Sequence, residues 1–150
     1  MNAHSDSHPP PHRLGRSVLA LLAGIVIGVV LSLGTDIGLH KAGVAPPLSE
    51  VWSNQLLLLA TAYRTIYSVI GSYVVARLAP NRPMGHALIG GAVGFALSVL
   101  GAAAAWNSNL GPHWYPVALA VIALPTAWIG GKLRLMQLQK GDRAAAAEMS

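Results

Sequence analysis

The stretch ATAYRTIYSVIGSY at 60–73 carries the side chains of this chain best suited to chemistry. Its Arg64 lies inside a long apolar run, where an ionised group costs about 2.5–3.5 kcal/mol at the centre of a membrane span. At about 100° per residue, Thr61, Ser68 and Ser72 share one sector of a helix with Arg64. A polar stripe of this kind is expected to face protein or water, away from lipid.

Asp36, in the apolar segment before this stretch, is the expected partner of Arg64, and His40 lies one helical turn further on. Tyr67, three residues after Arg64, can add a cation–π contact. Three interpretations follow: a clamp between two helices, a ligand or ion path, or an arginine that extends to the lipid headgroups. The candidate intramembrane polar cluster comprises Asp36, Arg64, Thr61, Ser68, Ser72 and His40.

Other chemistry has little support in the sequence. No carboxylate pair lies within an apolar segment, and no metalloprotease, nucleophile-elbow or phosphate-binding motif occurs, so no enzyme activity is expected. The chain has 0 cysteines, which excludes disulfides and thiolate chemistry. His4, His8 and His12 recur every fourth residue, but the prolines at 9–11 prevent the helix that would gather them around a metal. No cofactor is expected.

The composition indicates a membrane protein. Of 150 residues, 53% are hydrophobic and 10% are charged, whereas soluble domains carry about 25% charged residues. The mean hydropathy is +0.51. The net charge of +5 could suit a nucleic acid, but the basic residues flank apolar runs and form no patch. We therefore expect the lipid bilayer as partner, and no nucleic acid.

The apolar residues form four segments, each roughly 20 residues long, which is the length of helix that crosses a bilayer core about 30 Å thick. The sequence thus predicts an all-α, polytopic membrane protein with a four-transmembrane-helix bundle at 14–136. Its spans are expected at about 17–37, 56–79, 86–105 and 115–135. The first is too long for the apolar part of a signal peptide and is expected to remain uncleaved.

Polar segments and breaks lie outside these spans. The tail 1–13 is expected to be disordered, and 137–150 is expected to be a second tail that continues the last helix. Ser49 followed by Glu50 suggests a helix start, with an acid in the first turn. The sequence PNRP at 80–83 predicts a tight turn, and Pro125 a kink within the last span.

Basic residues predict the orientation, since cytoplasmic loops carry more Lys and Arg. One side of the predicted bundle has only Lys41; the other side has Arg13, Arg16, Arg77, Arg82, Lys132, Arg134, Lys140 and Arg143. Both termini are therefore expected in the cytoplasm. Aromatic residues should form a belt at the opposite face, from Trp52, Trp106, Trp114 and Tyr115, with Tyr73 and Trp128 nearer the cytoplasm.

Small residues at every fourth position predict where helices pack, because backbones approach closely there. The helix-packing candidates are Gly24, Gly28 and Ser32 in the first span and Gly90, Gly94 and Ser98 in the third. The two series match at a constant offset. Two explanations of this match stay open. The chain can contain a duplicated helical hairpin, or the two faces can match because glycine-rich packing faces have similar sequences in any helix.

Four stretches carry a resemblance: LSLGTDIGLH at 31–40, the segment 60–94, GPHWYP at 111–116 and ALPTAWIGGKLR at 123–134. Together they resemble a group of uncharacterised small four-span bacterial inner-membrane proteins. The resemblance implies a location in the bacterial inner membrane and does not indicate a biochemical activity.

Two functions remain open from the sequence. The first is a structural or accessory membrane protein that self-associates through its small-residue faces, as a homo-oligomer or in a larger complex. The alternative is a small transporter or channel with a polar path near Arg64 and Asp36. Small multidrug exporters and fluoride channels resemble this chain only in their small size. The exporters use a glutamate in the first helix, which this chain lacks, and both families commonly pair oppositely oriented subunits, against the charge bias seen here.

Overall fold

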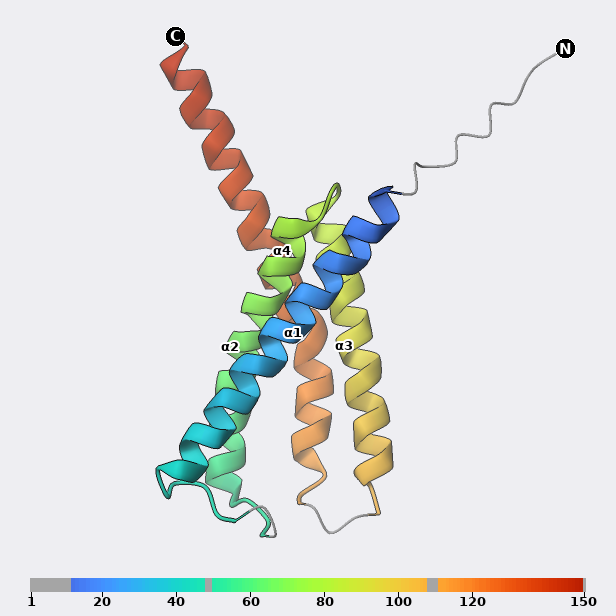
Figure 1. The fold of residues 1–150 in the computed structure, drawn as a ribbon, viewed down its shortest axis with the longest axis vertical. Helices are drawn as coiled ribbons and strands as arrows, with labels where there is room; N and C mark the ends of the chain where they lie inside the picture. Colours follow the sequence, from blue (N-terminus) through green and yellow to red (C-terminus); the bar gives the residue numbers. More distant parts are fainter. Residues whose placement is uncertain (1–11, 48–49, 108–110, 150) are drawn as a thin grey trace, which may run out of the picture.

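The chain folds into four α-helices joined by short loops (Figure 1). The computed structural model describes residues 12–47, 50–107 and 111–149. The helices are α1 (His12–Lys41), α2 (Asn54–Leu78), α3 (Pro83–Ala105) and α4 (Trp114–Glu148). This confirms the all-α prediction, and each predicted span lies on one helix.

Among the described residues, three helices are long and apolar enough to cross a membrane: α1 over Leu14–Lys41, α3 over Pro83–Ala104 and α4 over Trp114–Glu148. The prediction of a membrane protein is thereby supported, with three candidate spans instead of four. The helix α2 falls short because Arg64 and several hydroxyl-bearing residues dilute its apolar sequence. It nevertheless buries Leu57, Ala60 and Val75 against its neighbours.

Local sequence explains most helix ends. The Ser53 side chain caps α2 by accepting a hydrogen bond from the amide of Leu56 at 3.4 Å. The predicted start at Ser49–Glu50 is wrong, because Glu50 lies in a bend before the helix and Ser49 lies outside the described residues. In the turn after α2, Arg82 adopts a left-handed φ of 43°, and Pro83 opens α3 as the turn chemistry predicts.

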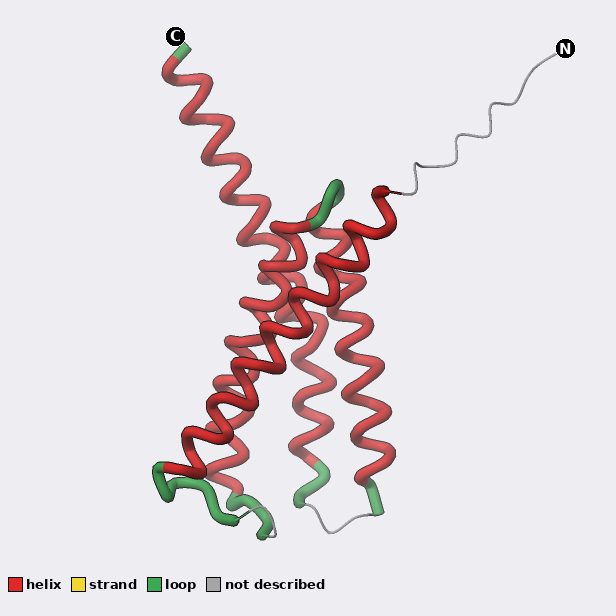
Figure 2. The backbone as a smooth tube through the Cα atoms, viewed as in Figure 1, coloured by secondary structure: helices red, strands yellow, loops and turns green. Residues whose placement is uncertain are grey.

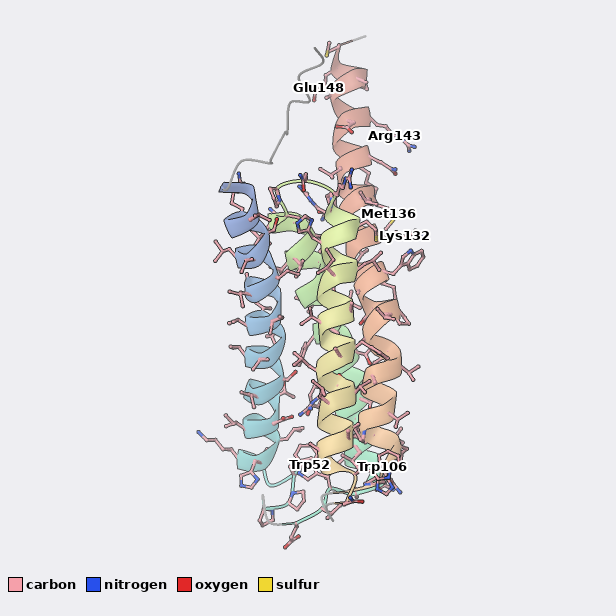
Figure 3. The ribbon with its side chains drawn as sticks, turned by 90° about the vertical axis from the view of Figure 1, so that its right-hand side faces the viewer. Trp52, Trp106, Lys132, Met136, Arg143 and Glu148 are labelled. Carbon is pink, nitrogen blue, oxygen red and sulfur yellow. The ribbon has the colours of Figure 1, made fainter. Side chains whose placement is uncertain are left out.

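The helix α4 is the longest, at 35 residues, and has Pro125 in its interior. Figure 1 shows the helix changing direction along its length, as expected where proline removes a backbone hydrogen bond. The helix continues through the predicted tail as far as Glu148 and protrudes beyond the bundle (Figure 3). At the other terminus, residues 1–11 of the expected disordered tail lie outside the described residues, and His12 and Arg13 already belong to α1.

The start of α1, the end of α4 and the α2–α3 turn lie at one end of the bundle, here named the terminal end (Figure 2). The α1–α2 and α3–α4 connections lie at the other, here named the connection end. The helices α2 and α3 each contact the other three, whereas α1 and α4 do not contact one another. The helix α1 crosses the bundle obliquely and has its main contact with α2 (Figure 1).

Glycines let the helices approach closely at three interfaces. A Cβ atom on Gly24 of α1 would lie 2.6 Å from the carbonyl oxygen of Gly71 on α2. A Cβ on Gly130 of α4 would lie 2.7 Å from the backbone nitrogen of Tyr73 on α2. At the α3–α4 interface, Gly91 lies against Ala127 in the same way. These contacts bring backbones together, which is how helices pack within lipid.

Aromatic side chains gather at the connection end, as the sequence predicts. Figure 3 shows Trp52 and Trp106 at this end of the molecule. The Trp106 ring stacks on His113, with centroids 4.4 Å apart, and the Trp114 indole nitrogen donates to Asn54 Oδ1 at 3.1 Å. These amphipathic rings form the kind of belt that marks a membrane–water interface.

Candidate functional site

Arg64 and Asp36 form an ion pair between α2 and α1. The Arg64 Nη2 donates to Asp36 Oδ2 at 2.7 Å, and the two side chains are 31% and 22% exposed. This confirms the predicted partnership of the two residues. The interpretation of Arg64 as a lone cation that extends to the headgroups is wrong, because its guanidinium is held by a carboxylate of the neighbouring helix.

Two tyrosines complete the site. The Tyr63 hydroxyl donates to Asp36 Oδ1, so each carboxylate oxygen of Asp36 accepts a hydrogen bond. The Tyr115 ring on α4 lies beneath the guanidinium, with its centroid 5.8 Å from Arg64 Cζ. We name Asp36, Tyr63, Arg64 and Tyr115 the polar cluster. It ties α1, α2 and α4 together.

The prediction of a cation–π contact between Tyr67 and Arg64 is wrong. The aromatic ring beneath the guanidinium is that of Tyr115. Thr35 donates its hydroxyl hydrogen to Leu31 O at 2.9 Å, so the 2.8 Å bond between Thr35 and Tyr67 has the tyrosine as donor. It makes a second polar link between α1 and α2.

The other predicted members of the cluster lie apart from it. Thr61 donates to Leu57 O, one turn back on its own helix, at 2.8 Å. His40 is exposed, with Nδ1 3.2 Å from the Pro46 carbonyl oxygen, and does not join the pair. Ser68 and Ser72 line a cavity that adjoins Arg64.

This cavity has a volume of about 400 Å³, is lined by residues from all four helices and is partly open to the surface of the bundle. Its polar lining residues are Ser32, Arg64, Tyr67, Ser68, Ser72, Ser98 and Thr126. Arg64 is the one charged residue among those that line it. The stripe predicted from α2 therefore contributes Arg64, Ser68 and Ser72 to the cavity wall.

The small-residue series of α1 and α3 also line the cavity, which differs from their predicted role in packing. Only Gly24 packs tightly, against Gly71. A Cβ on Gly94 would meet nothing within 4 Å, and a Cβ on Gly28 would have only the Tyr67 carbonyl oxygen at 4.0 Å. Within one chain the packing prediction fails at these two glycines. Gly90 has an ordinary contact with Leu21, and Ser32 and Ser98 face the cavity.

The two ends of the cavity differ. Toward the terminal end, the Gly24–Gly71 contact closes α1 onto α2, and Leu21 of α1 lies 3.4 Å from the Cβ position of Gly90 on α3. Beyond it, His86 Nε2 lies 2.9 Å from Ser17 Oγ, which links α3 to α1. Toward the connection end, Arg64 brings the polar cluster to the cavity wall.

Hydrogen bonding in the cavity is incomplete. Thr126 donates to the Ile122 carbonyl oxygen at 2.8 Å and is satisfied within its own helix. In contrast, no hydrogen bond to another described residue involves the side chains of Ser32, Ser68, Ser72 or Ser98. The Nε of Arg64 is buried and likewise has no partner in the described part of the chain. Burying a polar group in an apolar bundle costs free energy unless the group has a hydrogen-bond partner.

Sequence reasoning missed Tyr63 and the role of Tyr115. Tyr63 stands next to Arg64 in the chain, and this adjacency is the one signal that pointed to it. Comparisons with protein-family models, curated proteins and solved structures found no match to this chain. Among the described residues, no three His, Asp or Glu side chains gather as metal ligands would.

Proposed function

We propose that this chain is an integral protein of a bacterial inner membrane that lets a small hydrophilic solute cross the bilayer, as a small transporter or channel. One observation carries this proposal: a cavity of about 400 Å³ with a serine-rich wall lies among four otherwise apolar helices. Ionisable and hydroxyl groups within membrane spans are expensive, and they mark solute pathways when they line a shared cavity.

The proposal treats α2 as the fourth span. At 25 residues, α2 exceeds the roughly 20 needed to cross the bilayer core. Its polar residues Arg64, Ser68 and Ser72 line the cavity, so they do not require contact with lipid. Because α2 also contacts each of the other helices, its low apolarity suits a position inside the bundle.

The orientation follows from the charges at the terminal end. Arg77, Arg82 and Lys132 lie toward this end, and Lys140 and Arg143 are on the protruding part of α4. The positive-inside rule therefore favours a cytoplasmic terminal end. The resemblance to small four-span inner-membrane proteins supports the same localisation.

The test is flux across liposomes that contain the purified protein, with a variant that fills the cavity. Gly94→Leu adds a side chain at a cavity wall where a Cβ meets nothing within 4 Å. The matched control is Gly101→Leu on the same helix, where a Cβ also meets nothing and the residue does not line the cavity. Both chains should fold, since an added Cβ meets nothing within 4 Å at either position.

We expect wild type and Gly101→Leu to pass at least one member of a panel of small neutral solutes and ions faster than empty liposomes. Gly94→Leu should lower that rate about tenfold. If the folded wild-type protein passes no member of the panel, the proposed function is wrong.

A second function, a structural or accessory one, is favoured by the ion pair that clamps α1 to α2. The outer face of α1 is also strongly apolar and exposed, with Leu19 at 66% and Val30 at 60%. In this reading the face packs against another copy or a larger membrane complex. Cross-linking in native membranes would then give a discrete oligomer that Val30→Trp abolishes and that Gly94→Leu leaves intact.

A further inference from the structure

We infer that the cavity admits small uncharged molecules that carry several hydroxyl or amide groups, and that it excludes ions. This inference rests on the proposed function of solute passage and names its substrate class. Three properties of the cavity define this solute class: its hydrogen-bonding groups, its charge balance and its size.

The hydrogen-bonding groups match an uncharged polar solute. Each unpartnered serine hydroxyl can donate one hydrogen bond and accept others. Ser32 of α1, Ser68 of α2 and Ser98 of α3 present such groups from different sides of the cavity. A molecule with hydroxyl or amide groups supplies both donors and acceptors, whereas a lipid acyl chain would leave every one of these groups unbonded.

The charge balance disfavours ions of both signs. Arg64 is the one charged lining residue, and its charge is compensated by Asp36 at 2.7 Å. Among the described residues, no acidic side chain lines the cavity to replace the hydration of a cation. An anion would meet an arginine whose charge Asp36 already compensates, so no net positive charge would offset the loss of the anion's hydration. Uncharged solutes meet neither obstacle.

The size suits a small solute. At roughly 30 Å³ for each water molecule, 400 Å³ corresponds to about a dozen waters. This volume is near the lower limit of the ~300–1,000 Å³ typical of small-molecule sites. Glycines keep the space open, because Gly28 and Gly94 present only hydrogen atoms to the cavity where side chains would fill it.

The test measures selectivity in the same liposomes. Entry of glycerol and of urea is followed by stopped-flow light scattering, and potassium and chloride fluxes are followed with ion-sensitive dyes. For the wild type we expect glycerol or urea entry at least tenfold above empty liposomes, with ion fluxes at the background rate. The double variant Ser68→Ala/Ser98→Ala should lower the neutral-solute rate severalfold, with no loss of folded protein.

A second variant tests the charge balance. Asp36→Asn is nearly isosteric and retains an acceptor for Tyr63, but it leaves Arg64 without its counter-charge. We expect this variant to gain chloride flux severalfold over wild type while potassium flux stays at background. Size-exclusion chromatography in detergent checks that the variant remains folded, and Asp36→Glu, which keeps the charge, should show no gain.

The outcomes are distinguishable. Wild-type ion flux above background without entry of glycerol or urea would overturn the selectivity and leave the proposed solute passage standing. Passage of neither class by folded protein would overturn the proposed function itself. If Ser98→Cys forms a disulfide with a second copy, another chain occupies the cavity, and the inference is wrong.

Discussion

At the scale of single residues, the central feature is a carboxylate with a hydrogen bond to each oxygen. Asp36 accepts from Tyr63 and Arg64, and Arg64 stacks on Tyr115 of a third helix. The pair was predictable, because Asp36 is the one acidic residue within a predicted span and Arg64 lies inside the span that follows it. The tyrosines were not, because sequence spacing does not give the rotation of one helix against the next.

The ion pair between Arg64 and Asp36 should contribute to the free energy of unfolding. Removing one partner leaves the other charge unpaired, which costs about 3–5 kcal/mol in a fully buried site. Here both side chains retain some exposure, so we expect Arg64→Ala or Asp36→Ala to cost about 2 kcal/mol. The exchange Asp36→Arg/Arg64→Asp should recover part of this loss. Unfolding by SDS titration in mixed micelles measures each value; equal stability of all four proteins would contradict the clamp.

The two tyrosine hydrogen bonds should differ in strength. Tyr63 donates to a carboxylate, whereas Tyr67 donates to the neutral hydroxyl of Thr35. Hydrogen bonds to charged groups contribute about 1.5–3 kcal/mol, and neutral ones about 0.5–1.5 kcal/mol. Tyr63→Phe should therefore destabilise the protein more than Tyr67→Phe in the same SDS titration. The reverse order would show that the hydrogen bond from Tyr63 to Asp36 contributes less to stability than the one from Tyr67 to Thr35.

At the scale of the helices, glycines have two distinct roles. Gly24, Gly91 and Gly130 allow backbones to meet, while Gly28 and Gly94 keep a cavity open. The sequence predicted the helices and the four-residue spacing, because both are local properties. It could not separate the two roles, since the same spacing serves a helix that touches its neighbour and a helix held away from it by contacts elsewhere.

The two roles predict opposite responses to an added methyl group. Gly130→Ala would place Cβ 2.7 Å from Ser72 Cβ and from the Tyr73 backbone nitrogen. Overpacking of this kind costs about 1–3 kcal/mol. Gly94→Ala has open space and should be neutral or stabilise α3 by up to about 1 kcal/mol through helix propensity. Thermal unfolding in detergent compares them, and a neutral Gly130→Ala would contradict the close α2–α4 contact.

At the scale of the whole molecule, hydropathy identifies three candidate spans among the described helices, and α2 as a fourth span is our proposal. Over a stretch long enough to span the membrane, α2 is less apolar than the other three helices, because it contributes Arg64, Ser68 and Ser72 to the polar side of the interior. Composition and charge placement predicted the membrane class and an orientation. The cavity itself depends on how all four helices meet, which no single segment encodes.

Topology can be measured directly because the chain has 0 cysteines. If α2 crosses the membrane, Glu50→Cys and Asn81→Cys lie on opposite sides of it. A membrane-impermeant maleimide added to intact spheroplasts should label Glu50→Cys, and it should label Asn81→Cys only after lysis. Equal labelling of both variants from one side would show that α2 does not span.

The most direct test of the central claim, a cavity open to polar solutes within the bilayer, is cysteine accessibility along α3. Ser98 lines the cavity, and Leu100 on the same helix is 66% exposed on the outer surface of the bundle. A small hydrophilic thiol reagent reacts with thiolate, which forms in water and not in lipid. The account predicts that Ser98→Cys reacts at least tenfold faster than Leu100→Cys, and that adding Gly94→Leu abolishes the difference. Equal, slow reaction at both positions would contradict it.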